Sequence, residues 1–255
     1  GSGIGRAIAR RFAREGWFVG LGDVSEAGME ETAALLPAGA FRHRFDVRDR
    51  EAWDMALDRF AHAAGGRIDV LANNAGVPLG GALAELNRDE IDRTLDINLR
   101  GAIYGAQAAY PWLKASAPGS CLLNTASAAA LYGFSGQSIY GATKAGVRSL
   151  TETLDAEWAP DGIKVRSLMP SFIDTPLLQQ PPNASRNITI RQRVEQAGLE
   201  FTPVEVVAEA AWTAVHGTRV HTVVGKTARA MRFAAKWRPG RLRKRARLLG
   251  EAVEG

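Results

Sequence analysis

A tyrosine and a lysine four residues apart are the side chains in this sequence best suited to move a proton. Tyr140 and Lys144 would lie on one face of a helix, a single turn apart. A phenol is a poor acid or base at neutral pH because its pKa is normally about 10, and a nearby ammonium group lowers that pKa. Ser127 lies 13 residues before Tyr140 and could hydrogen-bond a substrate oxygen. The three side chains predict a proton-transfer site with Tyr140 as the acid–base group.

The same spacing also has an ordinary explanation. Many helices carry a Tyr and a Lys four residues apart as solvent-exposed neighbours without any chemical role. The spacing alone does not separate the two interpretations. The further motifs, in their order along the chain, favour the catalytic one.

A glycine-rich stretch opens the chain and leads directly into an amphipathic helix that ends at Gly16. The stretch consists of Ser2, Gly3, Ile4 and Gly5. A glycine turn at the start of a helix lets the backbone approach a pyrophosphate and presents the amide groups of the helix N-terminus to it. The stretch therefore predicts a phosphate-binding turn, although glycines in this pattern are weak evidence by themselves.

Asp23 strengthens that prediction. It follows the apolar residues 17–22 and lies 20 residues after Gly3, where an acidic side chain would accept hydrogen bonds from the adenosine ribose. A carboxylate at this position repels a 2′-phosphate, so Asp23 favours NAD over NADP. The alternative is that Asp23 caps the helix that follows, a role for which Ser25 competes.

Apolar and amphipathic segments alternate along most of the chain. Strands are expected at residues 17–22, 40–45, 68–72, 121–123, 163–169 and 220–224. Helices are expected at residues 4–15, 26–36, 49–64, 87–115 and 140–158 and from residue 203 onward, and Asn87 and Glu90 form a candidate capping box. This alternation predicts an α/β fold with one doubly wound parallel sheet between two helical layers.

No strand precedes the glycine turn, whereas a dinucleotide-binding fold begins with one. Either the first strand is missing from the sequence or the domain is built differently, and we favour the first explanation. The absence of that central strand would expose strand edges.

Composition places the chain among globular proteins and excludes several classes. Its 255 residues are 46% hydrophobic and 23% charged, and no apolar run is long enough for a membrane span. Cys121 is the single cysteine and lies in an apolar run, which indicates a buried side chain and a reducing, cytoplasmic location. The four histidines lack metal-ligand spacing, so no metal site is expected.

The positive charge is concentrated near the C-terminus. Residues 226–247 contain ten Lys and Arg and no Asp or Glu, so the net charge of +5 leaves −5 for the rest of the chain. Aromatic and aliphatic residues are interspersed among these cations. The segment 226–255 is therefore predicted to be a basic amphipathic extension, and residues 226–250 are a candidate for contact with an anionic membrane. The alternatives are a packed or solvated extension and, less favoured, nucleic-acid binding, for which no recognition module is present.

Taken together, the motifs resemble those of the short-chain dehydrogenase/reductase family over about residues 1–225. The matching positions are Gly3-Ile4-Gly5, Asp23, Asp46-Val47, Asn73-Asn74-Ala75-Gly76, Asn98, Ser127, Tyr140, Lys144 and Pro170 to Thr175. The resemblance implies a Rossmann-type fold, a nicotinamide cofactor, and hydride transfer between that cofactor and an alcohol or ketone. It also implies a homotetramer or homodimer.

The resemblance assigns roles to individual residues. Tyr140 would be the acid–base group, Lys144 would hold the nicotinamide ribose and lower the pKa of Tyr140, Ser127 would bind the substrate oxygen, and Asn98 would hold a water that relays protons. The cofactor-binding positions would be Ser2, Gly3, Ile4, Gly5, Asp23, Asp46, Val47, Asn73, Asn74, Ala75, Gly76, Tyr140, Lys144, Pro170, Ile173 and Thr175. Ser171 departs from the family, which usually has glycine there, a residue that permits positive φ and a close approach of the backbone to the nicotinamide.

Apolar residues near these motifs suggest a hydrophobic secondary alcohol or ketone as the substrate. They are Leu79, Leu131, Tyr132, Phe134, Phe172, Leu177 and Leu178, several of which could equally belong to the core. Residues 171–200 are predicted to form a mobile lid, whose Arg186, Arg191 and Arg193 could instead receive an acidic group. The alternative to an enzyme is a non-catalytic membrane-associated or scaffold protein on a degenerate cofactor-binding fold.

Overall fold

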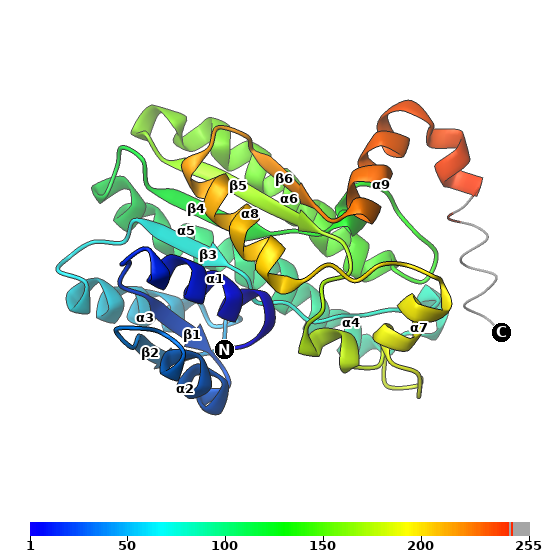
Figure 1. Cartoon of the computed structure of the whole chain (residues 1–255), viewed down its shortest axis with the longest axis horizontal. Helices are drawn as coiled ribbons and strands as arrows, with labels where there is room; N and C mark the ends of the chain where they lie inside the picture. Colours follow the sequence, from blue (N-terminus) through cyan, green and yellow to red (C-terminus); the bar gives the residue numbers. More distant parts are fainter. Residues whose placement is uncertain (245, 247–255) are drawn as a thin grey trace.

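All paired strands run parallel in the computed structural model, which describes residues 1–244 and 246. The strands are β1 (Gly20–Asp23), β2 (Phe41–Arg44), β3 (Val70–Asn73), β4 (Cys121–Thr125), β5 (Lys164–Pro170) and β6 (His221–Val224). They alternate with helices along the chain, as Figure 1 shows. The predicted Rossmann-like α/β fold is therefore confirmed.

The strands form two sheets rather than one. In the described part of the chain β1 pairs with β2, and a separate four-stranded sheet has the order β3-β4-β5-β6. No described strand joins β1 to β3, so the prediction of a single sheet is wrong in this respect. The division agrees with the expected exposure of strand edges where a central strand is lacking.

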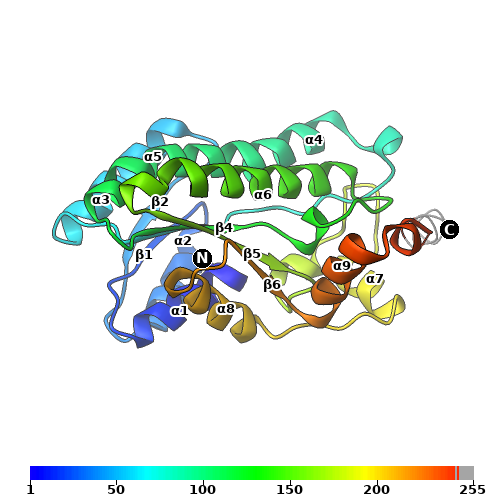
Figure 2. The ribbon, with the colours of Figure 1, turned by 90° about the horizontal axis from the view of Figure 1, so that it is seen from above.

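Helices cover both faces of the strands, as Figure 2 shows. The layer on one face contains α3 (Arg50–Ala63), α4 (Arg88–Leu95), α5 (Gly101–Ala115) and α6 (Ser138–Trp158). The other face is covered by α1 (Gly3–Arg14), α2 (Glu26–Ala34) and α8 (Val204–His216), with α1 packed against α8. The three-layer arrangement buries the apolar side of each amphipathic helix against the sheet.

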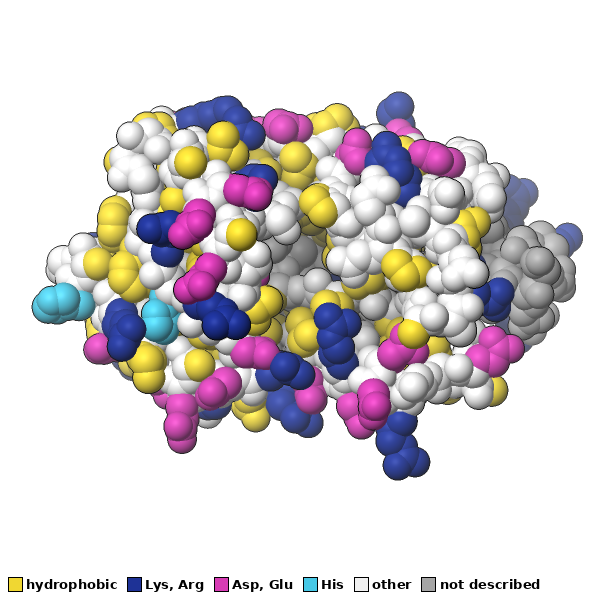
Figure 3. Space-filling model, turned by 90° about the horizontal axis from the view of Figure 1, so that it is seen from below, with side chains coloured by type: hydrophobic (Ala, Val, Ile, Leu, Met, Phe, Trp, Pro, Cys, Tyr) yellow, Lys and Arg dark blue, Asp and Glu magenta, His cyan; other side chains and the backbone are white. Residues whose placement is uncertain are grey.

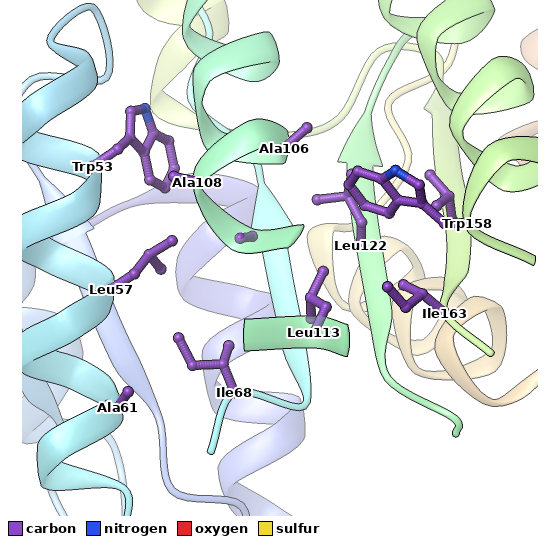
Figure 4. Close-up of a cluster of buried hydrophobic side chains, with 12 residues drawn as sticks. Trp53, Leu57, Ala61, Ile68, Ala106, Ala108, Leu113, Leu122, Trp158 and Ile163 are labelled. Carbon is purple, nitrogen blue, oxygen red and sulfur yellow. The ribbon is translucent and has the colours of Figure 1, made fainter. Parts of the chain in front are cut away.

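The core between α3, α5 and β4 is built from large apolar side chains. Figure 4 shows Leu57, Leu113 and Leu122 among the buried side chains of this cluster, and Leu113 and Leu122 are fully buried. Trp158 at the end of α6 closes the cluster on one side. Burying a leucine of this kind stabilises the fold by about 2 kcal/mol, so this cluster fixes α5 and α6 on the sheet.

Several element boundaries differ from the predicted ones. The strand predicted at residues 17–22 is observed as β1 at Gly20–Asp23, and Trp17 before it packs edge-on against Phe12 and Trp212. Asn87 caps α4 through the amide of Asp89, but the predicted capping box is absent, since the Glu90 carboxylate accepts from Ala184. Local propensity did not reveal these tertiary contacts.

The predicted lid is more ordered than the sequence indicates. It contains the 3-10 turns η5 (Pro176–Gln179) and the helix α7 (Ile190–Gln196), which begins with a capping box formed by Thr189 and Gln192. Hydrogen bonds join it to Gly80 and to Glu90 of α4, and a cavity of about 210 Å³ lies between the lid, residues 78–79 and α4. Its mobility remains a prediction.

Two expected absences concern the described residues. None of their helices is both long and apolar enough to span a bilayer. No cluster of three His, Cys, Asp or Glu side chains among them could hold a metal ion.

Candidate active site

The motifs of the sequence meet where the parallel strands end. Asn73 ends β3, Thr125 ends β4 and Pro170 ends β5, and the register places all three at the same edge of the sheet. Figure 3, which views the molecule from the side of the N-terminus, α2 and α4, shows a hollow in the middle of that face. In open α/β folds, ligands bind at the carboxyl ends of the strands.

Three of the predicted catalytic side chains come from neighbouring elements at this edge. Tyr140 and Lys144 lie in the first two turns of α6, with the Lys144 Nζ 5.9 Å from the centre of the Tyr140 ring. Ser127 caps the short turn η3 (Ala128–Ala130), and its hydroxyl accepts from the Ala129 amide. The Ser127 side chain also lies close enough to Tyr140 to lower the pKa of its phenol, so the two hydroxyl groups are neighbours.

The pKa of Tyr140 differs from the predicted direction. Burial raises the pKa of this phenol, and the neighbouring Ser127 hydroxyl, which lowers it, is the weaker influence. Lys144 does not contribute to this shift, although the sequence predicts that its ammonium lowers the Tyr140 pKa. The physical reason is desolvation, which disfavours the phenolate in the low-dielectric surroundings of the site.

Lys144 is held in an environment unusual for a lysine. Its side chain is 4% exposed, and burial lowers its pKa from 10.5 to about 8. Its Nζ donates to the carbonyl of Thr125 at 2.9 Å. A Cβ placed on Gly76 would lie 3.4 Å from this Nζ and 3.4 Å from the Asn98 Oδ1. Glycine at position 76 therefore leaves room for groups to approach the lysine.

Asn98 lies where a helix changes its winding. Residues Asp96–Arg100 form a π-helical turn, η2, between α4 and α5, whereas the sequence predicts one continuous helix. The Asn98 Oδ1 accepts from the Val77 amide at 2.8 Å, and its Nδ2 donates to the Val77 carbonyl at 2.9 Å. These bonds explain why an asparagine is tolerated within a helix, and they fix the 73–77 segment beside Lys144.

The glycine turn at the start of α1 faces the other ligand-binding segments. Gly3 has φ of +49°, which favours glycine, and a Cβ there would contact Thr175 at 3.3 Å. A Cβ on Gly5 would lie 3.0 Å from the Nδ2 of Asn74. Ser2 is exposed at the N-cap of α1, whose first turn contains no acidic residue. This end of the helix suits an anionic group such as a pyrophosphate.

Asp23 ends β1 and does not cap α2. Ser25 is the N-cap and accepts from the Gly28 amide, which decides between the two alternatives for the cap. The Asp23 carboxylate accepts from the Gly1 amino group at 2.7 Å and from the Ser25 amide at 2.9 Å. Burial raises the pKa of Asp23, but the hydrogen bonds outweigh burial and the net pKa is lowered.

Asp46 and Val47 follow β2 and lie near the start of α5. The Asp46 carboxylate pairs with Arg48 at 2.6 Å, a bond that lowers its pKa. A Cβ on Gly101 would contact the Val47 side chain at 2.9 Å. The Asp46 carboxylate is thus already paired with Arg48. The expected contact with the adenine would therefore have to be made by Val47 and its neighbours.

The segment after β5 fits the predicted site in part. Ser171 has no positive φ, so serine adopts its backbone conformation without strain, and its hydroxyl lies next to the Val224 carbonyl at 3.4 Å. The Ile173 side chain is 4% exposed and packs in the core with Ile8 and Phe12, so the predicted contact with the nicotinamide could come only from its backbone. Thr175 adjoins Gly3, as described above.

The expected apolar pocket residues divide between core and surface. Leu79 and Leu178 are buried, whereas Leu131, Tyr132 and Phe134 are partly exposed after η3. Cys121 is fully buried, so the prediction of a buried cysteine is confirmed, and burial raises the pKa of its thiol to about 12.

Sequence reasoning missed Thr125. Its carbonyl accepts from Lys144, and its hydroxyl donates to the Asn74 Oδ1 at 3.2 Å, so it connects the lysine with the 73–76 segment. Thr125 is the last residue of β4, and this position could have predicted its place in the site, because the carboxyl ends of the strands lie at the ligand site. Thr143, which is fully buried and donates to the Tyr140 carbonyl at 2.7 Å, gave no comparable signal.

Comparison with known proteins agrees with this arrangement. Residues 1–185 match the family described as short chain dehydrogenase. The chain belongs to this family. It is 33% identical to the meso-2,3-butanediol dehydrogenase of Serratia marcescens over 89% of this chain and 92% of the relative.

Solved structures of the short-chain dehydrogenase family have the same fold. A 3-ketoacyl-(acyl-carrier-protein) reductase from Brucella melitensis, complexed with NADH, superimposes with a TM-score of 0.77 at 29% identity, covering 88% of this chain and 92% of that one. An alcohol dehydrogenase from Thermococcus sibiricus, complexed with 5-hydroxy-NADP, gives a TM-score of 0.73 at 25% identity, with 88% and 92% coverage. Membership implies an oxidoreductase that uses a nicotinamide cofactor and a small-molecule substrate.

Proposed function

We propose that the protein is an NAD-dependent dehydrogenase or reductase acting on a hydrophobic secondary alcohol or the corresponding ketone. The observation that carries this proposal is the adjacency of the Ser127 and Tyr140 hydroxyl groups, beside the buried amine of Lys144. A degenerate, non-catalytic fold would have no need to keep a lysine buried without a carboxylate partner, since burial of that charge is costly.

The residues of the site fit a nicotinamide dinucleotide. The turn at Gly3 and Gly5 opens towards Asn74 and Thr175, and the N-terminus of α1 suits a pyrophosphate. Gly76 leaves space beside Lys144, where the nicotinamide ribose would lie. When bound, the cofactor supplies the hydride chemistry, and the protein orients the reactants.

The protein groups would divide the remaining work. Ser127 holds the substrate oxygen by a hydrogen bond, and the Tyr140 hydroxyl exchanges the proton on that oxygen. Lys144 supplies positive charge when protonated, which its pKa of about 8 allows at neutral pH. Asn98 fixes Val77 and thereby the wall of the site next to Lys144. The proton relay through Asn98 remains part of the proposal.

Asp23 is the basis for proposing NAD rather than NADP. Its carboxylate ends β1, and an aspartate carboxylate is ionised at neutral pH, so it would repel a 2′-phosphate. The relatives do not decide the matter, because one named structure contains NADH and another contains an NADP derivative.

The proposed substrate class follows from the surroundings of the site. Tyr132 and Phe134 pack edge-on 6.0 Å apart in the segment after η3 and present apolar surface. Arg191 is paired with Asp174, and Arg186 lies 3.8 Å from Glu85, which leaves these lid arginines less suited to an acidic substrate. A relative named as a butanediol dehydrogenase is consistent with a small secondary alcohol.

The test is a screen of secondary alcohols, including meso-2,3-butanediol, with NAD and with NADP, followed at the nicotinamide absorbance. We expect reduction of NAD by at least one alcohol, and we expect Asp23→Ser to shift the preference towards NADP. In parallel, titration calorimetry measures the binding of NAD and of NADP to the protein. Failure to bind either cofactor would favour the non-catalytic scaffold, whereas binding without turnover of any alcohol would reject the substrate class alone.

The proposal includes a homodimer or homotetramer, as is common in this family. Light scattering with sedimentation of the purified protein would measure the subunit number. A monomer at micromolar concentration would remove this part of the proposal and leave the chemistry untouched.

A further inference from the structure

The helix α9 (Lys226–Trp237) presents an unusual exposed surface at the end of the molecule that also holds α7, as Figures 1 and 2 show. Five exposed residues lie three or four positions apart and share one side of the helix. They are Arg229, Arg232, Phe233, Lys236 and Trp237, which we call the α9 face. Its aromatic rings are among the most exposed large apolar side chains described, at 55% for Phe233 and 64% for Trp237.

The rest of α9 is attached to the protein. Ala228 is fully buried, and the helix packs against β6 and η3, the turn that Ser127 caps. Glu200 accepts from the Lys226 amide at 2.6 Å and lies 3.5 Å from its ammonium group, which fastens the start of the helix. The α9 face is therefore carried by a helix that is anchored to the protein at its start, and its five side chains are exposed.

The cations of this region lack neutralising partners in the described structure. Beyond Lys226, no Lys or Arg of residues 229–244 lies within 4 Å of a described carboxylate. Instead, Lys236 lies 4.9 Å from the centre of the Trp237 ring, and Arg238 lies 5.9 Å from that of Phe233. Further exposed cations follow at Arg241, Arg243 and Lys244, whereas Leu242 is buried and turns its apolar side inward. Of the predicted extension, residue 245 and residues 247–255 lie outside the described residues.

We propose that the α9 face docks on the surface of an anionic phospholipid membrane. An interfacial helix combines aromatic side chains, which enter the headgroup region, with Lys and Arg, which meet lipid phosphates. The helix has 12 residues, about 18 Å long, so it lies on a membrane and does not cross it. The positive charge of the α9 face favours an anionic partner. A second copy of the same face is disfavoured, because the two sets of cations would repel each other.

The inference goes beyond the proposed oxidoreductase activity and does not depend on it. A membrane at the α9 face would stand beside η3 and thus beside the segment that carries Ser127. Catalysis measured on a water-soluble alcohol would be unchanged by loss of membrane contact, so failure of one proposal leaves the other testable.

Vesicle flotation with the full chain tests the docking. Vesicles of phosphatidylcholine with one third phosphatidylglycerol are compared with vesicles of phosphatidylcholine alone. We expect partitioning only to the anionic vesicles, and its loss at about 1 M salt, where the screening length falls to about 3 Å. Equal binding to both kinds of vesicle would overturn the charge-based proposal, as would no binding to either.

Two sets of variants assign the contact to the α9 face. Replacing Arg229, Arg232 and Lys236 together by Gln should weaken partitioning about 100-fold, since each cation near an anionic surface contributes about a factor of five. Replacing Arg59, Arg88 and Arg219 by Gln is the matched control, because these exposed arginines lie elsewhere. An equal effect of both sets would mean that overall charge, and not this face, carries the binding.

The second set removes the apolar contribution. Phe233→Ser with Trp237→Ser should reduce partitioning by at least about 10-fold while the cations remain. Phe18→Ser with Leu83→Ser, at residues that are 49% and 56% exposed, is the control and should leave binding unchanged. Thermal unfolding verifies that each variant is folded.

Two other occupants of the face are outcomes of the same experiment. A DNA duplex that binds more tightly than the vesicles and displaces them would overturn the membrane proposal in favour of a nucleic-acid surface. Sedimentation that shows Trp237→Ser converting an oligomer into monomers, without vesicle binding by the wild type, would overturn it in favour of a subunit interface.

Discussion

The first turns of α6 and the exposed side of α9 are built from the same kinds of residue and differ in their surroundings. Tyr140 and Lys144 are four residues apart, as are Phe233 and Trp237 with cations beside them. Lys144 is 4% exposed and its pKa falls to about 8, whereas Lys236 is exposed beside the Trp237 ring. A spacing of four residues brings two side chains together on a helix. Burial then decides whether a charged group has a shifted pKa and can take part in chemistry, or stays solvated and available for binding.

Removal of the Tyr140 hydroxyl should give the largest effect. We expect Tyr140→Phe to lower kcat/KM about 1000-fold, because general acid–base groups contribute about 100- to 10,000-fold. Initial rates on the best alcohol from the screen measure this, with Tyr104→Phe on α5 as the matched control. Retention of more than a tenth of the activity would contradict the role of Tyr140.

The buried amine of Lys144 should make stability depend on pH in a defined direction. The folded pKa of about 8 lies below the ordinary value of 10.5, so below pH 8 the fold carries the full cost of the buried charge. From pH 8 to 10.5 the folded protein has lost the proton that the unfolded chain still binds, and wild-type stability rises by about 3 kcal/mol.

Lys144→Met lacks this titration, so its stability relative to wild type should fall by about 3 kcal/mol over the same pH range. Urea unfolding of both proteins at several pH values measures the difference. A difference that stays constant from pH 8 to 10.5 would show that the lysine is not buried as the structure has it.

Asn98 should matter for stability as well as for activity. Asn98 is 1% exposed, and Asn98→Ala leaves the part-buried amide and carbonyl of Val77 without their bonds, so we expect a loss of about 2 kcal/mol. Asn87→Ala, which removes the exposed cap of α4, is the comparison and should cost about 1 kcal/mol. Denaturant unfolding gives both values, and equal losses would show that the π-helical turn does not depend on the Asn98 amide.

The exposed aromatic residues should have the smallest effect in solution. Phe233→Ser with Trp237→Ser should change the free energy of unfolding by less than about 0.5 kcal/mol per residue, because neither side chain is buried. Activity on a soluble alcohol should also be unchanged. A loss of several kcal/mol would mean that the face packs against another part of the protein or a second subunit.

Much of the site could be predicted from the sequence because its residues fall at strand ends and on successive turns of one helix. The Tyr140 and Lys144 spacing, the glycine turn before α1 and the position of Asp23 after β1 depend on local periodicity. Local periodicity did not reveal the π-helical turn at Asn98, since the bond with Val77 joins residues 21 positions apart. It also missed the helix α7, which a capping box starts within a proline-rich segment.

The sequence by itself determined the order of elements, the family and the chemistry of the motifs, because those depend on residue type and near-neighbour spacing. Tertiary structure alone decided that the pKa of Tyr140 is raised, that Lys144 donates to Thr125, that the Ile173 side chain belongs to the core, and that the strands divide into two sheets. Desolvation and long-range hydrogen bonding arise only when distant segments meet, so no local pattern contains them.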